Sequence, residues 1–363
     1  MKILFVVEHF YPHLGGAEKS LADLALGLIK SGHKVRVVTS NSGGITGKHQ
    51  HKGIEIYSYK WKSFFGHPVP SMKDLFEHGE WPDLIQTAPY TAAPRALKLS
   101  KKTHTPIAML SYEYLGKKWY WVEITPKALA FKAFESYVYH KPYSAYIAIS
   151  KATKRDLVSA GIEKQKITVI YPVFNNFDEW MPEITSKSKK NKVKEFIYYG
   201  RPGKTKGVDI LVDAIGLIKK ELGSKAVFTL ILSDDPMPNR VTIIEKIKKL
   251  NIVRMVRVRN SLPFKDLKQS IADSYCVIVP SVTEGFGFSA YQACLMKKNI
   301  IASDAGSLPE VVFGNALVFK NRDAQDLSKN ILKAVEGDFS NYQKKIKNNQ
   351  VEKVINLYNK LIN

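Results

Sequence analysis

Two successive series of strand-like and helix-like segments constrain the fold of this 363-residue chain most strongly. In the first series, the apolar run KILFVV (2–7) precedes an amphipathic helix pattern (17–32) and a second apolar run, KVRVVT (34–39). A strand, a helix and a strand at this spacing form a βαβ unit, whose strands are parallel. Further strands of the same series are predicted at 54–59, 83–88, 106–112, 145–150 and 167–171.

A polar, Lys-rich stretch without periodicity, residues 175–194, separates the two series and predicts a linker. After it, strands are predicted at 195–200, 228–233, 253–258, 276–280, 299–303 and 316–319, and helices at 207–222, 240–250, 264–273 and from 287. We therefore expect an α/β protein with two doubly wound, Rossmann-like domains, 1–174 and 195–340, that face each other across a cleft. The basic C-terminal stretch, 341–363, is predicted to be a helix that docks back on the first domain.

The net charge of +22 is unusual, and it is spread along the chain, since residues 1–172 carry +11 of it. Such a charge attracts nucleic acid, anionic lipid or phosphorylated substrates, although a Lys-rich proteome would explain it equally well. No nucleic-acid recognition module is evident, so we expect no nucleic-acid partner. The two cysteines form no disulfide or metal pattern, and no apolar run reaches the ~18 residues of a membrane span or forms a signal-peptide core. A cytoplasmic protein is expected.

Three short stretches carry candidate binding residues. In PHLGGAEKSL (12–21), Gly15 and Gly16 lie between a strand and a helix, where backbone N–H groups and the helix dipole favour a phosphate. The spacing is not the dinucleotide fingerprint GxGxxG, and a simple glycine-containing turn remains an equal alternative.

The second stretch, YYGRPGKTKG (198–207), places Arg201 and Lys206 on one loop after a strand. Two cations at this position suit a diphosphate, because arginine binds an anion bidentately and lysine acts as a point charge. The alternative is a pair of solvated loop cations, as is common in a basic protein.

The third stretch, TEGFGFSAYQACL (283–295), combines a carboxylate, Glu284, with Gly285 and Gly287 at the start of a helix. A carboxylate repels phosphate but accepts hydrogen bonds from hydroxyl groups, such as those of a sugar beside the phosphate. Glu284 could also simply satisfy the N-terminal dipole of the helix.

Together, the order and spacing of these stretches resemble the retaining glycosyltransferases of family 4, which have the GT-B fold. The resemblance extends over nearly the whole chain and includes PSVTEGFGFSAYQA and IIASDAGSLPEVV. It implies catalysis without a metal or other cofactor, because cationic side chains stabilise the leaving diphosphate. No D-x-D metal motif occurs in the sequence.

By this resemblance, Arg201, Lys206 and Glu284 form the catalytic set, in which the two cations neutralise the diphosphate and Glu284 binds the donor sugar. Gly16, beside Gly15, would offer a backbone N–H to the diphosphate. Further donor contacts are implied for Gly285, Phe286, Gly287, Phe288 and a loop around Val258 and Arg259 beside the nucleobase.

Three positions depart from the family pattern. Gln292 replaces the usual second glutamate, and we expect the loss of a charge-assisted hydrogen bond to a ribose, on the order of 1 kcal/mol. Tyr112 and Glu113 stand where a histidine near the reacting sugar is common, and Gln86 or Thr87 stands in place of another. Tyr112, Glu113 and His13 are the acceptor-side candidates, although His13 more simply lines a loop.

The segment 116–143 mixes lysines with aromatic residues, including Lys117, Lys118, Trp119 and Trp121. This composition predicts contact with an anionic membrane, and an ordinary core helix with a basic outer face is the alternative.

The function predicted first is a retaining, metal-independent hexosyltransferase of polysaccharide or cell-envelope synthesis. It would move a sugar from a nucleotide-sugar donor to a surface-glycan or lipid-linked acceptor on the inner face of the cell membrane. Gln292, Tyr112 and Glu113 keep open a non-catalytic partner subunit that binds nucleotide sugar, and an epimerase of the same fold is a third possibility.

Overall fold

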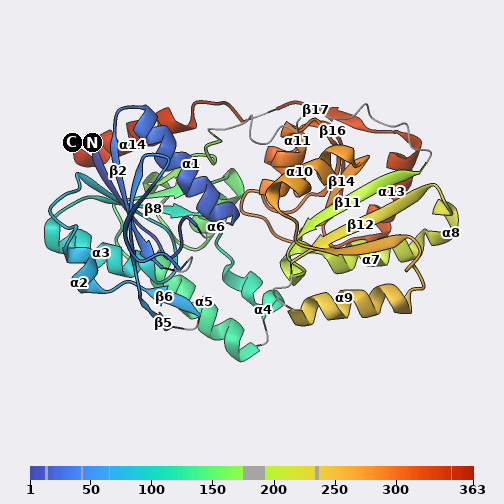
Figure 1. Ribbon diagram of the computed structural model, residues 1–363, viewed down its shortest axis with the longest axis horizontal. Coiled ribbons are helices and arrows are strands. Elements are labelled where there is room, and N and C mark those ends of the chain that lie inside the picture. Colours follow the sequence, from blue (N-terminus) through green and yellow to red (C-terminus); the bar gives the residue numbers. More distant parts are fainter. Residues whose placement is uncertain are drawn as a thin grey trace. The chain divides into compact units, whose positions relative to one another are not determined.

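The computed structural model describes residues 1–12, 15–41, 44–64, 66–123, 125–174, 193–233, 237–344 and 346–363. The chain forms two compact units, Met1–Asn176 with Lys347–Asn363, and Phe177–Ile346 (Figure 1). Each unit has a sheet of mainly parallel strands covered by helices, which confirms the predicted pair of α/β domains. Most of the predicted linker, residues 175–192, lies outside the described residues, as does His13.

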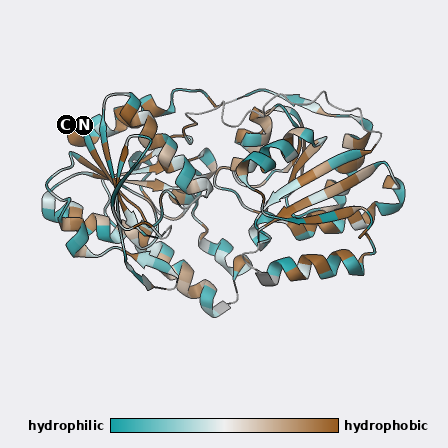
Figure 2. Cartoon of the chain, viewed as in Figure 1, coloured by the Kyte–Doolittle hydropathy of each residue, from teal (hydrophilic) through white to brown (hydrophobic). Residues whose placement is uncertain are grey.

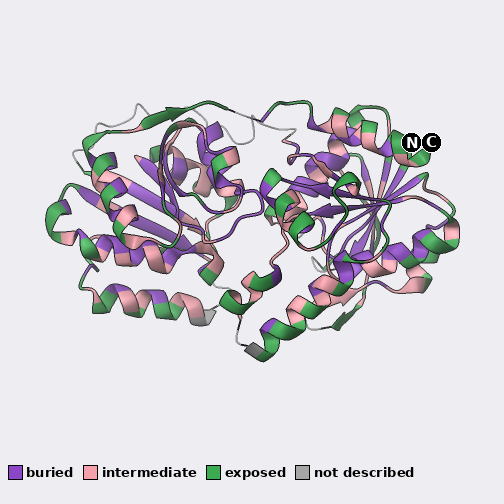
Figure 3. Cartoon of the chain, turned by 180° about the vertical axis from the view of Figure 1, so that it is seen from behind, coloured by how far each residue is buried: buried purple, intermediate pink, exposed green. Residues whose placement is uncertain are grey.

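The first unit contains an eight-stranded sheet of order β10-β9-β8-β7-β1-β2-β4-β3, in which only β3 runs antiparallel to its neighbour. The strands are β1 (Lys2–Val6), β2 (Lys34–Ser40), β3 (Gly47–His51), β4 (Ile54–Tyr59), β7 (Leu84–Thr87), β8 (Ile107–Ser111), β9 (Ala145–Ala148) and β10 (Ile167–Val169); β5 (Lys62–Phe64) and β6 (His67–Val69) form a separate hairpin. The central strands are buried along nearly their whole length (Figure 3). Burial on both faces explains why they appear in the sequence as continuous apolar runs.

The helices of the first unit are α1 (Gly16–Lys30), α2 (Met72–Phe76), α3 (Ala92–Thr103), α4 (Trp119–Val122), α5 (Thr125–Tyr139), α6 (Lys151–Ser159) and α14 (Gln350–Ile362). The C-terminal helix α14 packs against α1 and β7. The hydroxyl of its buried Tyr358 donates to Oε1 of Gln86 at 2.5 Å. The prediction of a helix from residue 341 is wrong for its first part, because Ser340–Tyr342 forms a strand and the helix begins at Gln350.

The second unit contains a seven-stranded sheet of order β13-β12-β11-β14-β15-β16-β17, parallel except for β17. Its strands are β11 (Lys194–Gly200), β12 (Ala226–Leu232), β13 (Val256–Asn260), β14 (Cys276–Val279), β15 (Asn299–Ser303), β16 (Gly314–Phe319) and β17 (Ser340–Tyr342). Its helices are α7 (Val208–Leu217), α8 (Lys219–Leu222), α9 (Met237–Lys249), α10 (Phe264–Asp273), α11 (Phe288–Leu295), α12 (Leu308–Val311) and α13 (Ala324–Glu336). Helices α3, α13 and α14 are amphipathic and carry both hydrophobic and hydrophilic residues (Figure 2), whereas six consecutive residues of α11, Ala290–Leu295, are buried.

Two expectations for the second unit are corrected. Val258 and Arg259 lie within the edge strand β13 rather than in a loop, because the strand begins and ends later than the apolar run indicates. Helix α13 was not predicted, although its ends carry clear signals. The side chain of Asp323 accepts a hydrogen bond from the backbone N–H of Asp326 at the N-cap, and Gly337 ends the helix with φ +86°.

Each sheet has one point at which the chain reverses its direction of strand addition. In the first sheet β1 lies between β2 and β7, and in the second β11 lies between β12 and β14. Parallel α/β sheets bind ligands outside the carboxyl ends of the strands at such switch points. The three glycine-containing stretches of the sequence follow β1, β11 and β14, which are strands at these two points.

His78 supports a prediction about the pH dependence of stability. Its side chain is 4% exposed, and its ring nitrogens lie 3.4 Å from the Arg36 guanidinium and 2.9 Å from the Tyr59 hydroxyl. Burial, and then the charge of Arg36, lower the pKa of His78 from 6.5 to about 4. As the pH falls below 6.5, the unfolded chain therefore takes up a proton that the folded chain excludes.

We expect the free energy of unfolding to fall by about 2 kcal/mol between pH 6.5 and pH 5. A difference of one bound proton between the unfolded and the folded chain changes this free energy by about 1.4 kcal/mol per pH unit. Urea unfolding at several pH values measures this loss. The His78→Gln variant has no titratable group at this position and should not lose stability between pH 6.5 and pH 5. Below pH 4.5 both proteins should lose stability, because the pKa of Glu55 is lowered to about 2 in the folded chain. Parallel curves for the two proteins above pH 5 would contradict the assignment to His78.

Candidate functional site

Two loops meet at the switch point of the second sheet, residues 201–207 after β11 and 280–287 after β14. The backbone N–H of Val282 donates to the carbonyl of Thr205 at 2.8 Å. Gly207 has φ +63°, and a Cβ there would lie 2.0 Å from the carbonyl oxygen of Pro280. Only glycine allows this approach, so the two loops form one rigid surface.

Lys206 and Glu284, predicted from separate stretches, are brought into direct contact. The Nζ of Lys206 lies 2.6 Å from Oε1 of Glu284, which also accepts a hydrogen bond from Ser281 Oγ at 2.8 Å. Glu284 is only 9% exposed, so this ion pair is poorly solvated on its acidic side. Arg201 lies on the same loop as Lys206 with an exposed side chain, and its carbonyl accepts the Tyr198 hydroxyl at 2.9 Å.

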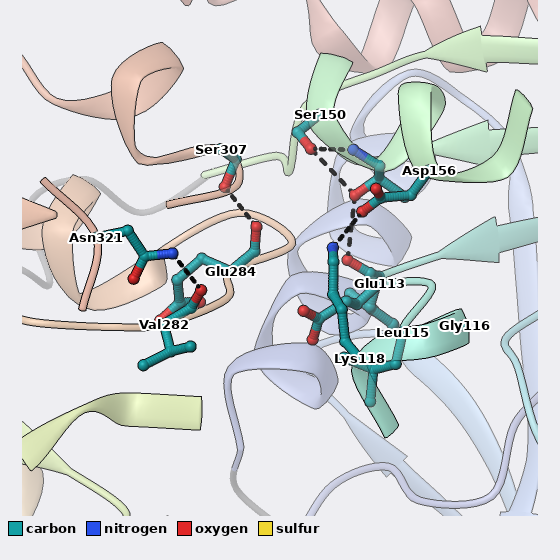
Figure 4. A network of polar contacts seen from close by, with 12 residues as sticks. Glu113, Leu115, Gly116, Lys118, Ser150, Asp156, Val282, Glu284, Ser307 and Asn321 are labelled. Atoms are coloured by element: carbon teal, nitrogen blue, oxygen red, sulfur yellow. Dashed lines mark hydrogen bonds and ion pairs between the residues drawn. The ribbon is translucent and has the colours of Figure 1, made fainter. Parts of the chain in front are cut away.

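The backbone around Glu284 is held from a second side by residues that follow β15 and β16. The N–H and hydroxyl of Ser307 both donate to the Glu284 carbonyl, and Asn321 Nδ2 donates to the Val282 carbonyl at 3.0 Å (Figure 4). A Cβ on Gly306 would lie 2.2 Å from the same Glu284 oxygen. These contacts fix the carboxylate of Glu284 through its main chain.

Helix α11 begins directly after this loop. Its N-cap, Gly287, has φ +85°, and a Cβ there would lie 2.7 Å from Leu308. The ring of Phe286 is buried and packs at 5.1 Å from Phe288 and 5.3 Å from Tyr291. The aromatic side chains of the predicted donor set therefore stabilise the loop by packing against one another and against Tyr291. Gly285, which precedes Phe286, is buried.

Gln292, one turn further along α11, is 7% exposed and contacts Tyr199 of β11. Its Oε1 lies 3.2 Å from the Tyr199 hydroxyl, which also lies 2.8 Å from the Ser289 carbonyl. Within the described part of the chain, Nε2 of Gln292 has no hydrogen-bond partner although it is buried. Buried polar atoms are nearly always paired, so this amide is a candidate ligand contact.

In the first unit, Gly15 is the N-cap of α1 and Gly16 is its first residue. Tyr112 donates its hydroxyl to the carbonyl of Ala17 at 2.8 Å, and burial raises the pKa of this phenol. The carbonyl of Glu113 accepts the Tyr139 hydroxyl at 2.8 Å. Tyr112 therefore anchors the start of α1, and its hydroxyl is occupied by that contact.

The predicted membrane contacts divide into two pairs. Lys117 and Trp121 are exposed, the latter to 54%. Lys118 instead pairs with Asp156 at 2.8 Å, and the ring of Trp119 packs on α5 at 5.1 Å from Phe131. Among the described residues, no helix is both long and apolar enough to cross a bilayer.

Four residues of the site were not predicted from the sequence. Thr205 connects the two loops, Ser281 and Ser307 donate hydrogen bonds to Glu284, and Tyr199 contacts Gln292. The small hydroxyl residues close to the motif glycines could have indicated these contacts, whereas nothing in the sequence distinguishes Tyr199 from other strand residues. In the described ranges, no three His, Cys, Asp or Glu side chains gather as a metal site requires. The absence of a metal in catalysis stays a prediction.

Comparison with known proteins identifies the family. Residues 14–175 match the family model described as Glycosyltransferase Family 4, and residues 181–353 match that of Glycosyl transferases group 1. The chain belongs to glycosyltransferase family 4.

Relatives in sequence extend the match. One subunit of the human phosphatidylinositol N-acetylglucosaminyltransferase is 21% identical over 92% of this chain and 68% of its own length. A 41.2 kDa protein of the cps region of Klebsiella pneumoniae is 30% identical over 56% of this chain, and the match spans 58% of that protein.

Solved structures show the same fold. Anabaena HepE, crystallised with UDP-glucose, has a TM-score of 0.73 at 18% identity, over 100% of this chain and 96% of HepE. Sucrose-phosphate synthase of Thermosynechococcus elongatus has a TM-score of 0.71 at 17% identity, over 100% and 95% of the two chains. The predicted GT-B fold is confirmed, and the chain is a glycosyltransferase of the GT-B type.

The close approach of Gly306 to Glu284 yields a prediction about stability. Gly306→Ala combines positive φ (+53°) with a backbone clash, whereas Gly314→Ala in the same unit has φ +78° and no atom within 4 Å. We expect Gly314→Ala to cost about 1–2 kcal/mol, the penalty of left-handed backbone, and Gly306→Ala to cost at least about 2 kcal/mol more. Chemical denaturation measures the loss of unfolding free energy in both variants. Equal losses would contradict the prediction and would show that the Glu284 loop can move to accept a methyl group at position 306.

Proposed function

We propose that this glycosyltransferase transfers a hexose from a nucleotide sugar with retention of anomeric configuration and without a metal ion. The ion pair of Lys206 and Glu284 at the switch point of the second sheet carries the proposal. It places a cation and a hydroxyl-binding carboxylate side by side, as a sugar diphosphate requires. Lys206 and Arg201 would stabilise the charge that develops on the leaving diphosphate, the electrostatic contribution that is usually largest in such transfers.

The Lys206–Glu284 contact also suggests how the donor is accommodated. A diphosphate carries more charge than one carboxylate, so it would attract the Lys206 ammonium away from Glu284. Glu284 would then accept hydrogen bonds from donor-sugar hydroxyls, while Ser281 and the fixed backbone of its loop keep the carboxylate in place. The departing diphosphate would accept the proton of the acceptor hydroxyl.

Tyr199 offers a way for Gln292 to replace the family's glutamate. The Tyr199 hydroxyl has one hydrogen, and the Ser289 carbonyl is its nearer acceptor. With the Gln292 amide turned by half a rotation, Nε2 would donate to the Tyr199 oxygen and satisfy the buried nitrogen. Oε1 would then be available to a donor ribose hydroxyl, as a carboxylate oxygen is.

UDP-sugars are the first donors to test, since the HepE structure contains UDP-glucose. We expect release of nucleoside diphosphate when the enzyme receives a UDP-sugar and an acceptor extract of cell-envelope glycans and lipids. Lys206→Ala and Glu284→Ala should each lower this rate at least ~100-fold, as losses of charge-stabilising groups do. Lys246→Ala is the matched control, because it breaks a 2.6 Å ion pair with Asp213 elsewhere in the same unit.

Other outcomes of this assay would identify the alternatives. Nucleotide-sugar binding with no turnover would favour the non-catalytic partner subunit, and a changed sugar nucleotide formed without acceptor would favour an epimerase. Unchanged release in both Lys206→Ala and Glu284→Ala would refute the proposed roles of the pair.

We further propose that the acceptor is lipid-linked and that the enzyme contacts an anionic membrane through its first unit. Helices α4 and α5 expose Tyr120, Trp121, Leu129 and Tyr137. Lysines 117 and 127 are exposed among them, and Lys132 lies 5.2 Å from the Tyr120 ring. Exposed aromatic residues with lysines are typical of an interfacial contact, in which rings enter the headgroup region and ammonium groups bind phosphates.

The protein should therefore sediment with vesicles that contain phosphatidylglycerol and not with phosphatidylcholine vesicles, and high salt should release it. Trp121→Ser should weaken the binding several-fold because it removes a large ring from a residue that is 54% exposed. Val253→Ser, which alters a 57% exposed apolar residue of the second unit, should leave binding unchanged. Equal sedimentation with both vesicle types would contradict an electrostatic contact.

A further inference from the structure

A buried carboxylate and a half-exposed histidine meet at the switch point of the first sheet. Glu8 follows β1, and Tyr90 and Thr91 follow β7, the strand beside β1. His67 is the first residue of β6, in the small hairpin that precedes β7 in the sequence. These residues therefore occupy the position at which parallel α/β sheets bind ligands.

Glu8 is fully engaged within this cluster. Its side chain is 9% exposed, and Oε1 accepts hydrogen bonds from the backbone N–H of Thr91 at 2.5 Å and from its hydroxyl at 2.6 Å. Oε2 lies 2.9 Å from Nδ1 of His67. A buried carboxylate needs such partners, and the bonds to Thr91 fix the direction of the oxygen that His67 meets.

His67 is held in one orientation and one tautomer by this contact. Since the carboxylate accepts, Nδ1 carries the hydrogen, and the neutral ring has its lone pair on Nε2. The His67 side chain is 41% exposed, and its ring centre lies 5.5 Å from that of Tyr90, a non-glycine residue with φ +74°. If His67 only attached the hairpin to Glu8, any hydrogen-bond donor would be sufficient. Histidine adds a second nitrogen, Nε2, that points in another direction.

We propose that Nε2 of His67 accepts a hydrogen bond from a hydroxyl group of the sugar acceptor, and that Glu8 is its positioning residue. This inference rests on the proposed glycosyl transfer and extends it to the first unit. It also replaces Tyr112 as the acceptor contact, because the hydroxyl of Tyr112 already donates a hydrogen bond to the carbonyl of Ala17.

The protonation of His67 gives the proposal a pH dependence. The hydrogen bond to Glu8 raises the pKa of His67 above 6.5, although burial opposes the shift. Among the described residues, the titratable groups that contact the ring are Glu8, from the end of β1, and Tyr90, from the segment after β7. Because the imidazolium has no lone pair, acceptor binding should weaken as the pH falls through this raised pKa.

The kinetic test separates acceptor binding from donor binding. In His67→Asn the amide can still donate to Glu8, but the outer nitrogen is lost. In Glu8→Gln the bonds from Thr91 can persist, while the amide N–H₂ facing Nδ1 favours the opposite tautomer, with hydrogen on Nε2. His104→Asn is the control, because His104 is exposed at the end of α3 with φ +55°, which asparagine tolerates.

Transfer of radiolabel from a UDP-sugar to the acceptor extract is measured as a function of extract and donor concentration. We expect His67→Asn and Glu8→Gln to raise the KM for the extract at least tenfold, to leave the donor KM unchanged, and to lose the acid limb of the pH profile. His104→Asn should match the unmodified enzyme. An unchanged acceptor KM in His67→Asn, or an equal rise in donor KM, would overturn the proposal.

A second measurement requires no turnover. The ¹⁵N shifts of His67, followed in the full chain, should show hydrogen on Nδ1, and they should reverse in Glu8→Gln. Titration with octyl glucoside, octyl galactoside and octyl N-acetylglucosaminide should move the Nε2 signal of His67 with at least one of them. Hydrogen on Nε2, or no response to any glycoside, would refute the subsite, whereas absence of nucleoside diphosphate release with every donor would refute the proposed function instead.

Discussion

The contact between the 201–207 and 280–287 loops is the constraint on which the candidate site depends. Val282 binds the Thr205 carbonyl, and Gly207 lies so close to Pro280 that no side chain fits between them. Without this contact the ends of β11 and β14 would be independent loops, and Lys206 would have no fixed distance to Glu284. Because Ser307, Gly306 and Asn321 hold the second loop from its other side, the position of one carboxylate is determined by strands across the whole centre of the sheet.

The two units use the same principle with different chemistry. Both place polar side chains after the first strand of the series and after its non-sequential neighbour, where a parallel sheet leaves its carboxyl ends open. In the second unit the result is a lysine paired with a carboxylate, which suits a charged phosphate and its sugar. In the first unit it is a carboxylate that orients a histidine, which suits a neutral hydroxyl group.

Much of the fold could be predicted from the sequence, because buried parallel strands must be apolar on both faces and therefore stand out as short runs. Helix α13 was missed although Asp323 and Gly337 marked its ends, so the local capping signals were sufficient to predict it. The motif residues were found through their types and spacing, but the direct contact of Lys206 with Glu284 joins residues 78 positions apart in the chain. The bond of Tyr112 to Ala17 and the pairing of Glu8 with His67 likewise depend on sheet order, which local patterns do not specify.

Helix α14 has a consequence for the order in which the protein is made. Its Tyr358 closes a buried contact with Gln86, and its Gln350 accepts the backbone N–H of Tyr171. The ribosome therefore synthesises the entire second unit before the first unit can acquire the helix that covers α1 and β7. During that interval the second unit, whose residues are contiguous, can fold on its own, while the nascent first unit still exposes an apolar surface to chaperones.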